Sequence, residues 1–562
     1  MELNSDEKLK KVLSKWELTY LSLGGIIGSG WLFAPLGAAA YAGVYSIFSW
    51  IISGFMMIII ALTYAEIASM LPRSGGIIRY PHYTHGKIVG FFMFWEYLIS
   101  AVSTVSVEAV GAVTYLSHFL PSLYSNGQLS LKGILLTYLL IIIFFFANYY
   151  GVKILGRISH GMGWWKLIIP TITTIILFFF INSTNFTLPS NFEGMFYAIP
   201  ASGIVFSYLG FRQAIEYGGE GKNPQKDIPF ALLSSLSIAM VLFTLLQIGF
   251  IGALNISSAN WKSLLSSPIS NSPIFSVLQI HSIASIELPL DFWLTILIFD
   301  SIVSPIGTGI IYTGTSARTI YASATNGYLP KLFAKVNEKG IPEISLYVSI
   351  ISAGLFLLPL PSWFAIVNIS STATVTTYIM GGIELESFRK LYPHIKRPFS
   401  LPYWRMISPL STIFASLLVY WSGFSTLFYI IVIGLLGLSF YLLLSSEKKI
   451  INLISIINIT VISILFYRFT NNLNNANNLF FFIFLVIVSL SIISQLILYK
   501  DKREVRASYW LIIFLVMIIT LSYFSSFGLY TVIEFPYDTL ILGVLMLIIH
   551  YLAVNTSIPI QT

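Results

Sequence analysis

The most constraining feature of this 562-residue chain is a series of apolar runs that fill almost its whole length. Each run is roughly 18 to 25 residues long, which at about 1.5 Å per helical residue matches the ~30 Å hydrocarbon core of a bilayer. Charged residues make up only 10% of the chain, whereas soluble proteins carry about 25%. The sequence therefore predicts an all-α polytopic membrane protein and excludes a water-soluble enzyme.

We expect about sixteen spans from the apolar periodicity, with ends that are uncertain by a few residues. They fall at roughly 17–42, 44–70, 90–120, 132–150, 163–182, 196–218, 229–254, 289–322, 343–360, 362–386, 406–422, 424–445, 450–468, 478–499, 508–527 and 538–555. The long loop 255–288 contains a half-apolar stretch, PIFSVLQIHSIASI, that is expected to form a short surface helix.

The basic residues test this division of the chain. When the spans alternate from a cytoplasmic N-terminus, most of the 31 Lys and Arg residues fall on the same side as that terminus. Such residues concentrate in cytoplasmic loops. The sequence thus predicts a multi-pass protein of the cell membrane with both termini in the cytoplasm. The net charge of +8 becomes a topology signal, and a nucleic-acid partner is not expected.

Two of the spans carry features that an uninterrupted helix would not. The first reads LSLGGIIGSGWLFAPLG and crowds Gly24, Gly25, Gly28 and Gly30 around its middle. Each Gly costs about 1 kcal/mol relative to Ala in a helix interior. The sixth reads IPASGIVFSYLGFRQAIEYGGEGKNPQKDIP, with Gly203 among its glycines. Unwound backbone at membrane depth is tolerated only beside protein or a water-filled cavity. The alternative is close helix packing through small residues.

A matching break in two segments that lie five spans apart indicates a secondary transporter built from inverted repeats. The predicted organisation follows this symmetry. It comprises a cytoplasmic segment 1–16, a first five-helix repeat 17–182, a second five-helix repeat 196–386, helices eleven and twelve in 406–445, and extra transmembrane helices in 446–562.

Five ordered blocks of the chain resemble a known family. They are GGIIGSGWLF, ALTYAEIASMLPRSGG, SYLGFRQAIEYGGEGKNPQKDIP, TSARTIYASATNGYLPKLFAKVNEKGIP and RPFSLPYW. Together they are similar to the amino acid–polyamine–organocation superfamily of permeases over about residues 17–445. This resemblance implies the leucine-transporter-type fold of five plus five inverted repeats, with broken first and sixth helices and alternating access.

The resemblance also implies a substrate site at the two breaks. The α-carboxylate of an amino acid would bind the amides of Gly28, Ser29 and Gly30, because the N-terminus of a half-helix attracts anions. The α-ammonium group would bind the carbonyl groups of Ile26 and Phe206, with Ser207 and Leu209 nearby. Phe206 matches an aromatic residue that closes over the substrate; its alternative role is packing in the core.

The third span offers a lining for this pocket. Tyr97, Ser100, Ala101 and Val105 fall at helical spacing on one face. Glu108 in the same span is interpreted as a polar contact between helices, with a proton carrier as the alternative.

The coupling ion is expected to be a proton, with sodium as the alternative. In some members of the family a lysine at the position of Lys166 replaces a sodium ion and bridges the first and eighth helices. Ser304 and Thr308 are the expected hydroxyl partners of either cation. The competing interpretation is a lysine that extends from a helix end into cytoplasmic water.

Arg212 is where the chain departs from its relatives, which commonly have Gly-Phe-Glu where this sequence has Gly-Phe-Arg. An intramembrane charge is a functional-site hypothesis by default. Arg212 is expected to pair with Glu216 or Glu96, to gate the inner pathway or to favour an acidic substrate. Its positive charge disfavours polyamines.

These features favour a proton-coupled amino acid transporter over an exchanger or a polyamine transporter. The hypothesis of another class is a membrane sensor that binds an amino acid without moving it. No catalytic cluster, metal spacing or cofactor motif indicates an enzyme, and the expected partners are an amino acid and the bilayer.

Overall fold

The computed structural model describes residues 11–559 apart from 12, 74, 126, 151, 257–259, 285–287, 339, 359–361, 446–448, 471–484, 487–488, 491, 494–495, 498 and 500. Within that part the chain is almost entirely helical. Its only strands form a short antiparallel hairpin, β1 (Tyr124–Ser125) and β2 (Gln128–Leu129).

The helices of the first predicted repeat are α1 (Lys15–Ile26), α2 (Gly30–Ala42), α3 (Ser46–Met70), α4 (Gly76–Leu116), α5 (Leu131–Tyr149) and α6 (Val152–Phe178). Those of the second are α7 (Gly194–Ala201), α8 (Ile204–Tyr208), α9 (Gln213–Glu216), α10 (Pro224–Ala253), α11 (Pro273–Ala284), α12 (Leu288–Thr325), α13 (Glu343–Phe356) and α14 (Trp363–Leu391). The chain continues with α15 (Trp404–Tyr420), α16 (Phe424–Ser445), α17 (Lys449–Thr470), α19 (Lys502–Tyr523) and α20 (Tyr537–Thr556).

Short 3-10 turns connect these helices. They are η1 (Gly43–Tyr45), η2 (Pro121–Leu123), η3 (Ser183–Thr187), η4 (Leu209–Arg212), η5 (Gly218–Glu220), η6 (Trp261–Ser266), η7 (Pro268–Asn271) and η8 (Lys331–Ala334). The helix expected in the loop 255–288 is confirmed as α11, but its position on the surface is not, because residues 273–278 are buried against the rest of the protein.

By length and composition, eight helical stretches among the described residues can cross a membrane, or nine if the bent pair Gly194–Ala201 and Ile204–Glu216 is one span. This confirms a polytopic helical membrane protein. The figure of about sixteen stays a prediction, because α1 and α13 are shorter than a full span and most of the expected span 478–499 lies outside the described residues.

The region before the third expected span differs from the prediction. The sequence suggested a loop between residues 70 and 90, whereas α4 already begins at Gly76 and runs across a kink at Gly86. Gly86 adopts φ 76°, which glycine reaches without the steric cost that a Cβ would bring. Residues 76–90, which were expected to form a loop, are therefore helical on both sides of this kink.

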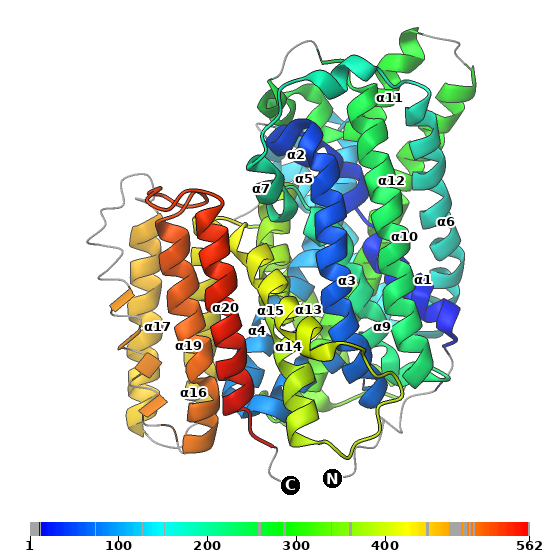
Figure 1. Cartoon of the computed structure of the whole chain (residues 1–562). Coiled ribbons are helices and arrows are strands. Elements are labelled where there is room, and N and C mark those ends of the chain that lie inside the picture. Colours follow the sequence, from blue (N-terminus) through cyan, green and yellow to red (C-terminus); the bar gives the residue numbers. More distant parts are fainter. Residues whose placement is uncertain are drawn as a thin grey trace.

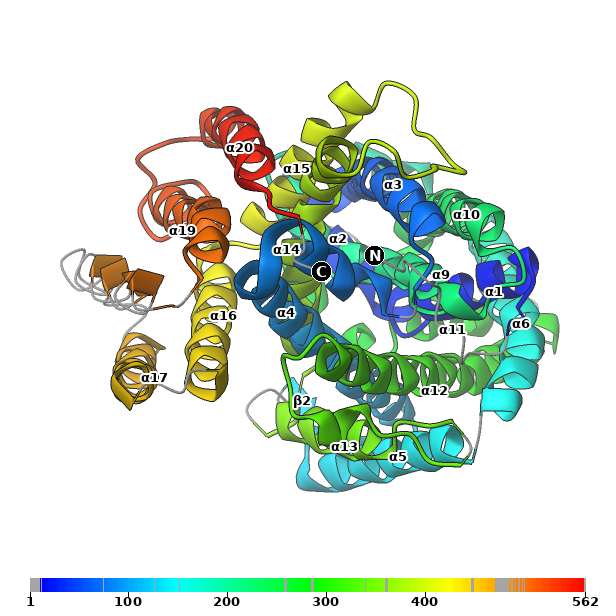
Figure 2. The ribbon, with the colours of Figure 1, turned by 90° about the horizontal axis from the view of Figure 1, so that it is seen from below.

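Figure 2 shows two parts of unequal size: a bundle of α1 to α15, and a group of α16, α17, α19 and α20 beside it. Specific contacts join the group to the bundle. His85 Nε2 of α4 lies 3.0 Å from the carbonyl oxygen of Ala553 in α20. His550 Nε2 of α20 lies 3.1 Å from Glu386 Oε2 of α14. The last helices are therefore packed against the bundle as part of one protein.

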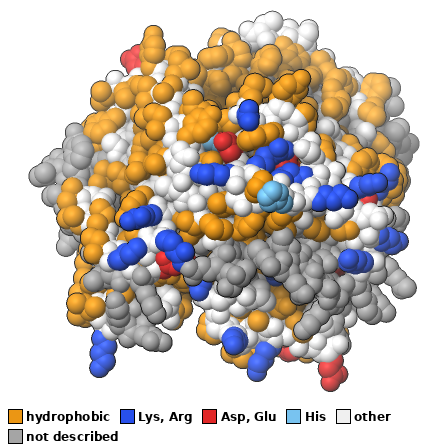
Figure 3. All heavy atoms as spheres, turned by 60° about the horizontal axis from the view of Figure 1, so that its bottom comes forward, with side chains coloured by type: hydrophobic (Ala, Val, Ile, Leu, Met, Phe, Trp, Pro, Cys, Tyr) orange, Lys and Arg blue, Asp and Glu red, His pale blue; other side chains and the backbone are white. Residues whose placement is uncertain are grey.

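The basic side chains on the surface are concentrated on one side of the protein (Figure 3). The two ends of the chain lie on the same side of the bundle (Figure 1). Lys and Arg side chains gather on that lower side, below a surface rich in apolar side chains (Figure 3). This pattern is typical of a multi-pass membrane protein whose basic face meets water.

Candidate functional site

The first break separates the half-helices α1 and α2. α1 ends at Ile26, residues 27–29 are not helical, and α2 begins at Gly30. The Gly28 amide donates to the Ile26 carbonyl at 3.1 Å. Two backbone groups that the family resemblance assigns to the substrate thus bind each other.

The amide of Ser29, the residue after Gly28, donates to the side chain of Glu108 in α4. The Glu108 Oε2 atom accepts this amide hydrogen at 2.7 Å, and both residues are fully buried. A Cβ placed on Gly28 would lie 2.5 Å from Glu108 Oε1. The glycine is therefore what lets the carboxylate reach the positive N-terminus of α2. This is the position expected for the carboxylate of a substrate.

The second break lies between α7 and α8. Gly203 has φ 94°, and the helical axis bends by 56° there. Phe206 packs edge-to-face on Trp363, with ring centroids 6.1 Å apart, and Ser207 Oγ donates to the Gly203 carbonyl at 2.9 Å. Leu209 starts the turn η4. The predicted residues of the sixth segment therefore surround a sharp change of direction.

Trp363 joins the two breaks, and sequence reasoning missed it. Its Nε1 donates to Ser29 Oγ at 2.7 Å, while its ring packs on Phe206. Trp363 is also the first residue of α14. In the sequence it lies at the start of a span, where tryptophans of membrane interfaces are common, so its position gives no sign of a role at the site.

The backbones of the two breaks touch at Gly25 and Gly210. A Cβ on Gly210 would overlap the backbone of Gly25 and Ile26, and a Cβ on Gly25 would lie 3.1 Å from the Cα of Gly210. The three atoms nearest to a Cβ on Gly210 are all backbone atoms, whereas a Cβ on Gly25 would also meet the Gln213 side chain at 2.9 Å. The glycine content of both segments is therefore explained by a direct backbone contact as well as by the breaks.

We expect Gly210→Ala to abolish transport, because overpacking of this kind costs about 1–3 kcal/mol and here has to separate two backbones. Gly543→Ala is the matched control, since its new Cβ would meet only Ile413 at 3.9 Å. Uptake by both purified variants in proteoliposomes is the measurement. Wild-type uptake by Gly210→Ala would show that the contact of the two breaks has no part in transport.

Lys166 bridges three helices at the first break. Its Nζ donates to the Gly24 carbonyl at 2.8 Å and to Thr308 Oγ1 at 2.5 Å. Thr308 Oγ1 also donates to the Gly24 carbonyl, at 2.8 Å. Lys166 is 1% exposed, so its side chain runs into the bundle and not toward the cytoplasmic water that the competing interpretation requires.

Two further groups belong to this cation site. Ser304, one helical turn before Thr308 in α12, donates to the carbonyl of Ile27 at 3.1 Å. Glu108 and Lys166 interact electrostatically. The structure therefore brings Lys166, Ser304, Thr308 and Glu108 together around the non-helical residues 27–29.

Arg212 forms a separate cluster with the predicted lining of the third span. The guanidinium carbon lies 4.6 Å from the ring centre of Tyr97 and 5.0 Å from that of Tyr312. It donates to Thr374 Oγ1 at 3.1 Å and to Ser100 Oγ at 3.5 Å. Arg212 is fully buried, and Ala101 is buried on α4 next to Ser100.

Neither expected acidic partner forms an ion pair with Arg212. Within the described residues, no carboxylate oxygen lies within 4.0 Å of its guanidinium. Glu216 is linked through the hydroxyl of Tyr97, which donates to Glu216 Oε1 at 2.8 Å. Glu96 faces α16, where its Oε1 abuts Gly434. Arg212 is thus a buried cation held by aromatic faces and hydroxyl groups.

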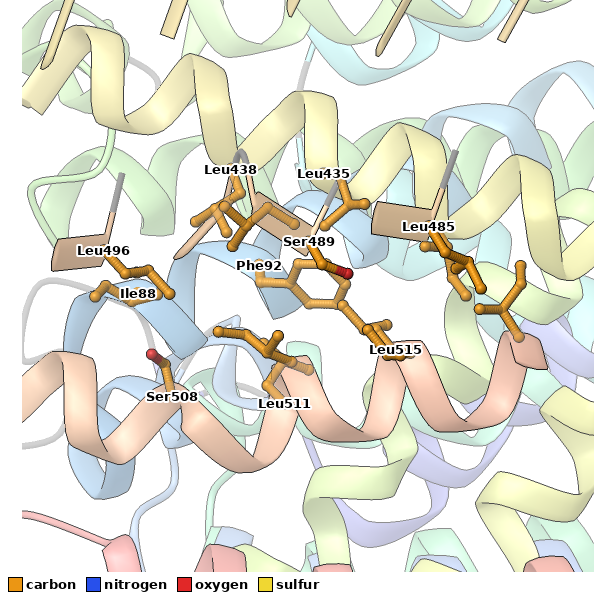
Figure 4. A pocket seen from close by; sticks show the side chains of 15 residues that line it. Ile88, Phe92, Leu435, Leu438, Leu485, Ser489, Leu496, Ser508, Leu511 and Leu515 are labelled. Carbon is orange, nitrogen blue, oxygen red and sulfur yellow. The ribbon is translucent and has the colours of Figure 1, made fainter. Parts of the chain in front are cut away.

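A different cavity lies between the bundle and the group of last helices (Figure 4). Its walls include Ile88, Phe92, Leu435, Leu511 and Leu515, and the polar side chains among its described lining residues are those of Ser489 and Ser508. Because none of these described lining residues carries a charge that could bind a zwitterion, we do not take this crevice as a candidate site for an amino acid.

Comparison with known proteins identifies the family to which the chain belongs. Residues 13–439 match the amino acid permease family. The chain is 32% identical to the aspartate-proton symporter of Bacillus subtilis (strain 168) over 99% of this chain and 98% of the symporter. The last helices therefore have a counterpart in that relative.

Two other relatives show the range of the family. The glutamate/serine transporter AimA of Bacillus subtilis (strain 168) is 35% identical over 79% of this chain and 83% of its own length. The arginine/agmatine antiporter of Chlamydia pneumoniae is 27% identical over 80% of this chain and 93% of the antiporter. The matched region includes both breaks, Lys166 and Arg212. The chain belongs to the amino acid permease family of membrane transporters.

Proposed function

We propose that this protein imports amino acids across the cell membrane by proton-coupled alternating access. The observation that carries the proposal is the Lys166 ammonium group, which bridges Gly24 of α1 and Thr308 of α12 in the membrane interior. Loss of its proton would remove the charge from both hydrogen bonds, and charge-assisted hydrogen bonds are roughly twice as strong as neutral ones. Protonation of one residue thereby controls how firmly the first break is held.

The same geometry favours a proton over sodium as the coupling ion. The carbonyl groups of Gly24 and Ile27 and the hydroxyl groups of Ser304 and Thr308 form a set of oxygen ligands of the kind that binds hard cations. Lys166 Nζ already contacts two of these oxygens. A lysine that fills the cation position makes the proton the ion that can be exchanged there.

Glu108 supplies a link between substrate and proton. Its carboxylate takes the Ser29 amide that a substrate carboxylate would need, so the two anions compete for one donor. Protonation of Glu108 weakens its hold on that amide and opens the donor to the substrate. We propose that substrate binding and protonation of the Glu108–Lys166 pair are coupled in this way.

We propose acidic amino acids as substrates. Burying an unpaired cation in a membrane helix costs about 3 kcal/mol. In the described part of the chain Arg212 has hydroxyl and aromatic partners but no carboxylate within ion-pair distance, and Glu216 acts on it from farther away. The side-chain carboxylate of aspartate or glutamate would supply an ion-pair partner. Two relatives support the class by name, an aspartate-proton symporter and a glutamate/serine transporter.

We also propose the division into repeats, the number of spans and the side of the membrane on which the termini lie. The two breaks correspond to the first and sixth helices of a leucine-transporter-type fold with five-helix repeats over 17–182 and 196–386, followed by helices to a total of about sixteen. The basic face is the cytoplasmic one, which places both termini in the cytoplasm.

Exchange is the second mechanism to consider, because one relative is an arginine/agmatine antiporter. An obligate exchanger would need substrate on both sides, and a sensor would bind substrate without flux. Uptake of radiolabelled aspartate into empty, sodium-free proteoliposomes separates these cases. We expect an inward pH gradient to stimulate uptake; the absence of stimulation would contradict proton coupling.

A further inference from the structure

Asp300 of α12 is a buried acidic residue that the proposed mechanism has not used. Its side chain is fully buried. Its Oδ1 accepts the Nε1 hydrogen of Trp165 at 2.7 Å, and its Oδ2 has no hydrogen-bond partner among the described residues. An unsatisfied carboxylate oxygen at such a depth is costly, which points to a role other than packing.

The surroundings of Asp300 connect it to the cation site. Trp165 directly precedes Lys166 in α6, and Asp300 and Lys166 interact electrostatically. Tyr115 of α4 also interacts with Asp300. The indole that binds Asp300 therefore belongs to the residue next to Lys166 on α6.

The spacing along α12 extends this connection. Asp300, Ser304, Thr308 and Tyr312 follow one another at intervals of four residues, which places them on one face of a helix. All four are buried, and Ser304 and Thr308 hydrogen-bond to the first break. Asp300 is the member nearest the end of α12 that follows the loop 255–288, the side predicted to be extracellular.

We propose that Asp300 is a second proton-binding residue, which relays protons from the extracellular side to Lys166 through the buried polar face of α12. This proposal rests on the proton-coupled transport proposed above. No hydrogen bond or ion pair joins Asp300 to Lys166 among the described residues, so the transfer passes through the hydroxyl group of Ser304, one turn from both Asp300 and Thr308. After Lys166 has released its proton to the cytoplasm, the O–H bond of the Asp300 carboxyl group breaks, Ser304 Oγ takes that proton while it gives up its own, and an N–H bond forms at the neutral Lys166 Nζ. The products are a carboxylate and an ammonium ion, and the carboxylate takes its next proton from external water.

The test separates proton delivery from substrate movement. Asp300→Asn keeps the size of the side chain and an oxygen that accepts from Trp165, but it cannot carry a proton. Counterflow, which exchanges labelled for unlabelled aspartate without a pH gradient, needs no net proton delivery. We expect the variant to keep counterflow within about twofold of wild type and to lose gradient-driven uptake at least about 100-fold, the lower end of the range for proton-transfer effects.

Two further variants sharpen the result. Asp300→Glu restores a carboxyl group and is expected to recover gradient-driven uptake with an altered pH profile. Asp291→Asn changes an exposed acid in the first turn of the same helix and is expected to behave as wild type in both assays.

Three results would overturn the relay. Gradient-driven uptake and a pH profile equal to wild type in Asp300→Asn would show that the carboxyl group carries no proton. An equal fall in counterflow and gradient-driven uptake, without recovery in Asp300→Glu, would show a structural role. If the wild-type protein itself gives no response to the gradient, the proposed function fails and the relay with it.

Discussion

Lys166→Met is expected to uncouple transport from the pH gradient completely. If one proton accompanies each substrate, a gradient of about two pH units supports about 100-fold accumulation, since each unit is worth 1.36 kcal/mol. Methionine keeps most of the apolar stem of lysine, one atom shorter, but cannot bind a proton. The variant should therefore only equilibrate aspartate across the membrane, and steady-state uptake with and without the gradient is the measurement.

Two controls accompany this variant. Lys166→Arg keeps a positive charge beside Gly24 and Thr308, but arginine does not lose its proton in proteins; it should fold and still fail to accumulate substrate. Lys226→Met alters an exposed lysine and should accumulate substrate as wild type does. Normal accumulation by Lys166→Arg would mean that Lys166 supplies only a fixed charge.

Arg212→Gln is expected to raise the KM for aspartate and glutamate by about 10- to 100-fold. Hydrogen bonds to charged groups contribute about 1.5–3 kcal/mol, and every 1.4 kcal/mol is a factor of ten in affinity. Glutamine keeps a donor toward Thr374 and Ser100 but lacks the charge. Transport of serine or another neutral amino acid should fall far less, so the ratio of the two KM values is the decisive measurement.

The control for this variant is Arg405→Gln, which removes an exposed arginine at the start of α15. Its KM values should match those of wild type. If Arg212→Gln lowered the transport of acidic and neutral substrates equally, Arg212 would be a structural residue held by Tyr97 and Tyr312, and the acidic preference would have another origin.

The architecture was largely predictable because it follows from local rules. Apolar runs of membrane-spanning length specify helices, and clustered glycines specify where helices stop. The breaks at residues 27–29 and Gly203 both lie in the segments that the glycines indicated. The prediction of a loop at about residues 70–90 was wrong, because α4 begins at Gly76 and continues through a kink at Gly86.

The contacts within the site were less predictable because they depend on tertiary packing. Lys166 was chosen by resemblance, and its bonds to Gly24 and Thr308 could not be read from spacing. Glu108 was interpreted as an ordinary helix contact, since its sequence neighbours do not reveal that it faces the Ser29 amide. Asp300, in contrast, had a readable signal in its four-residue spacing from Ser304 and Thr308.

The central claim, that acidic amino acids enter together with protons, has one direct measurement. A pH-sensitive dye enclosed in sodium-free proteoliposomes reports proton entry when aspartate is added outside, with the membrane potential clamped. We expect acidification of the interior that accompanies aspartate uptake and is absent in Lys166→Met. Aspartate uptake by the wild-type protein without internal acidification would contradict it.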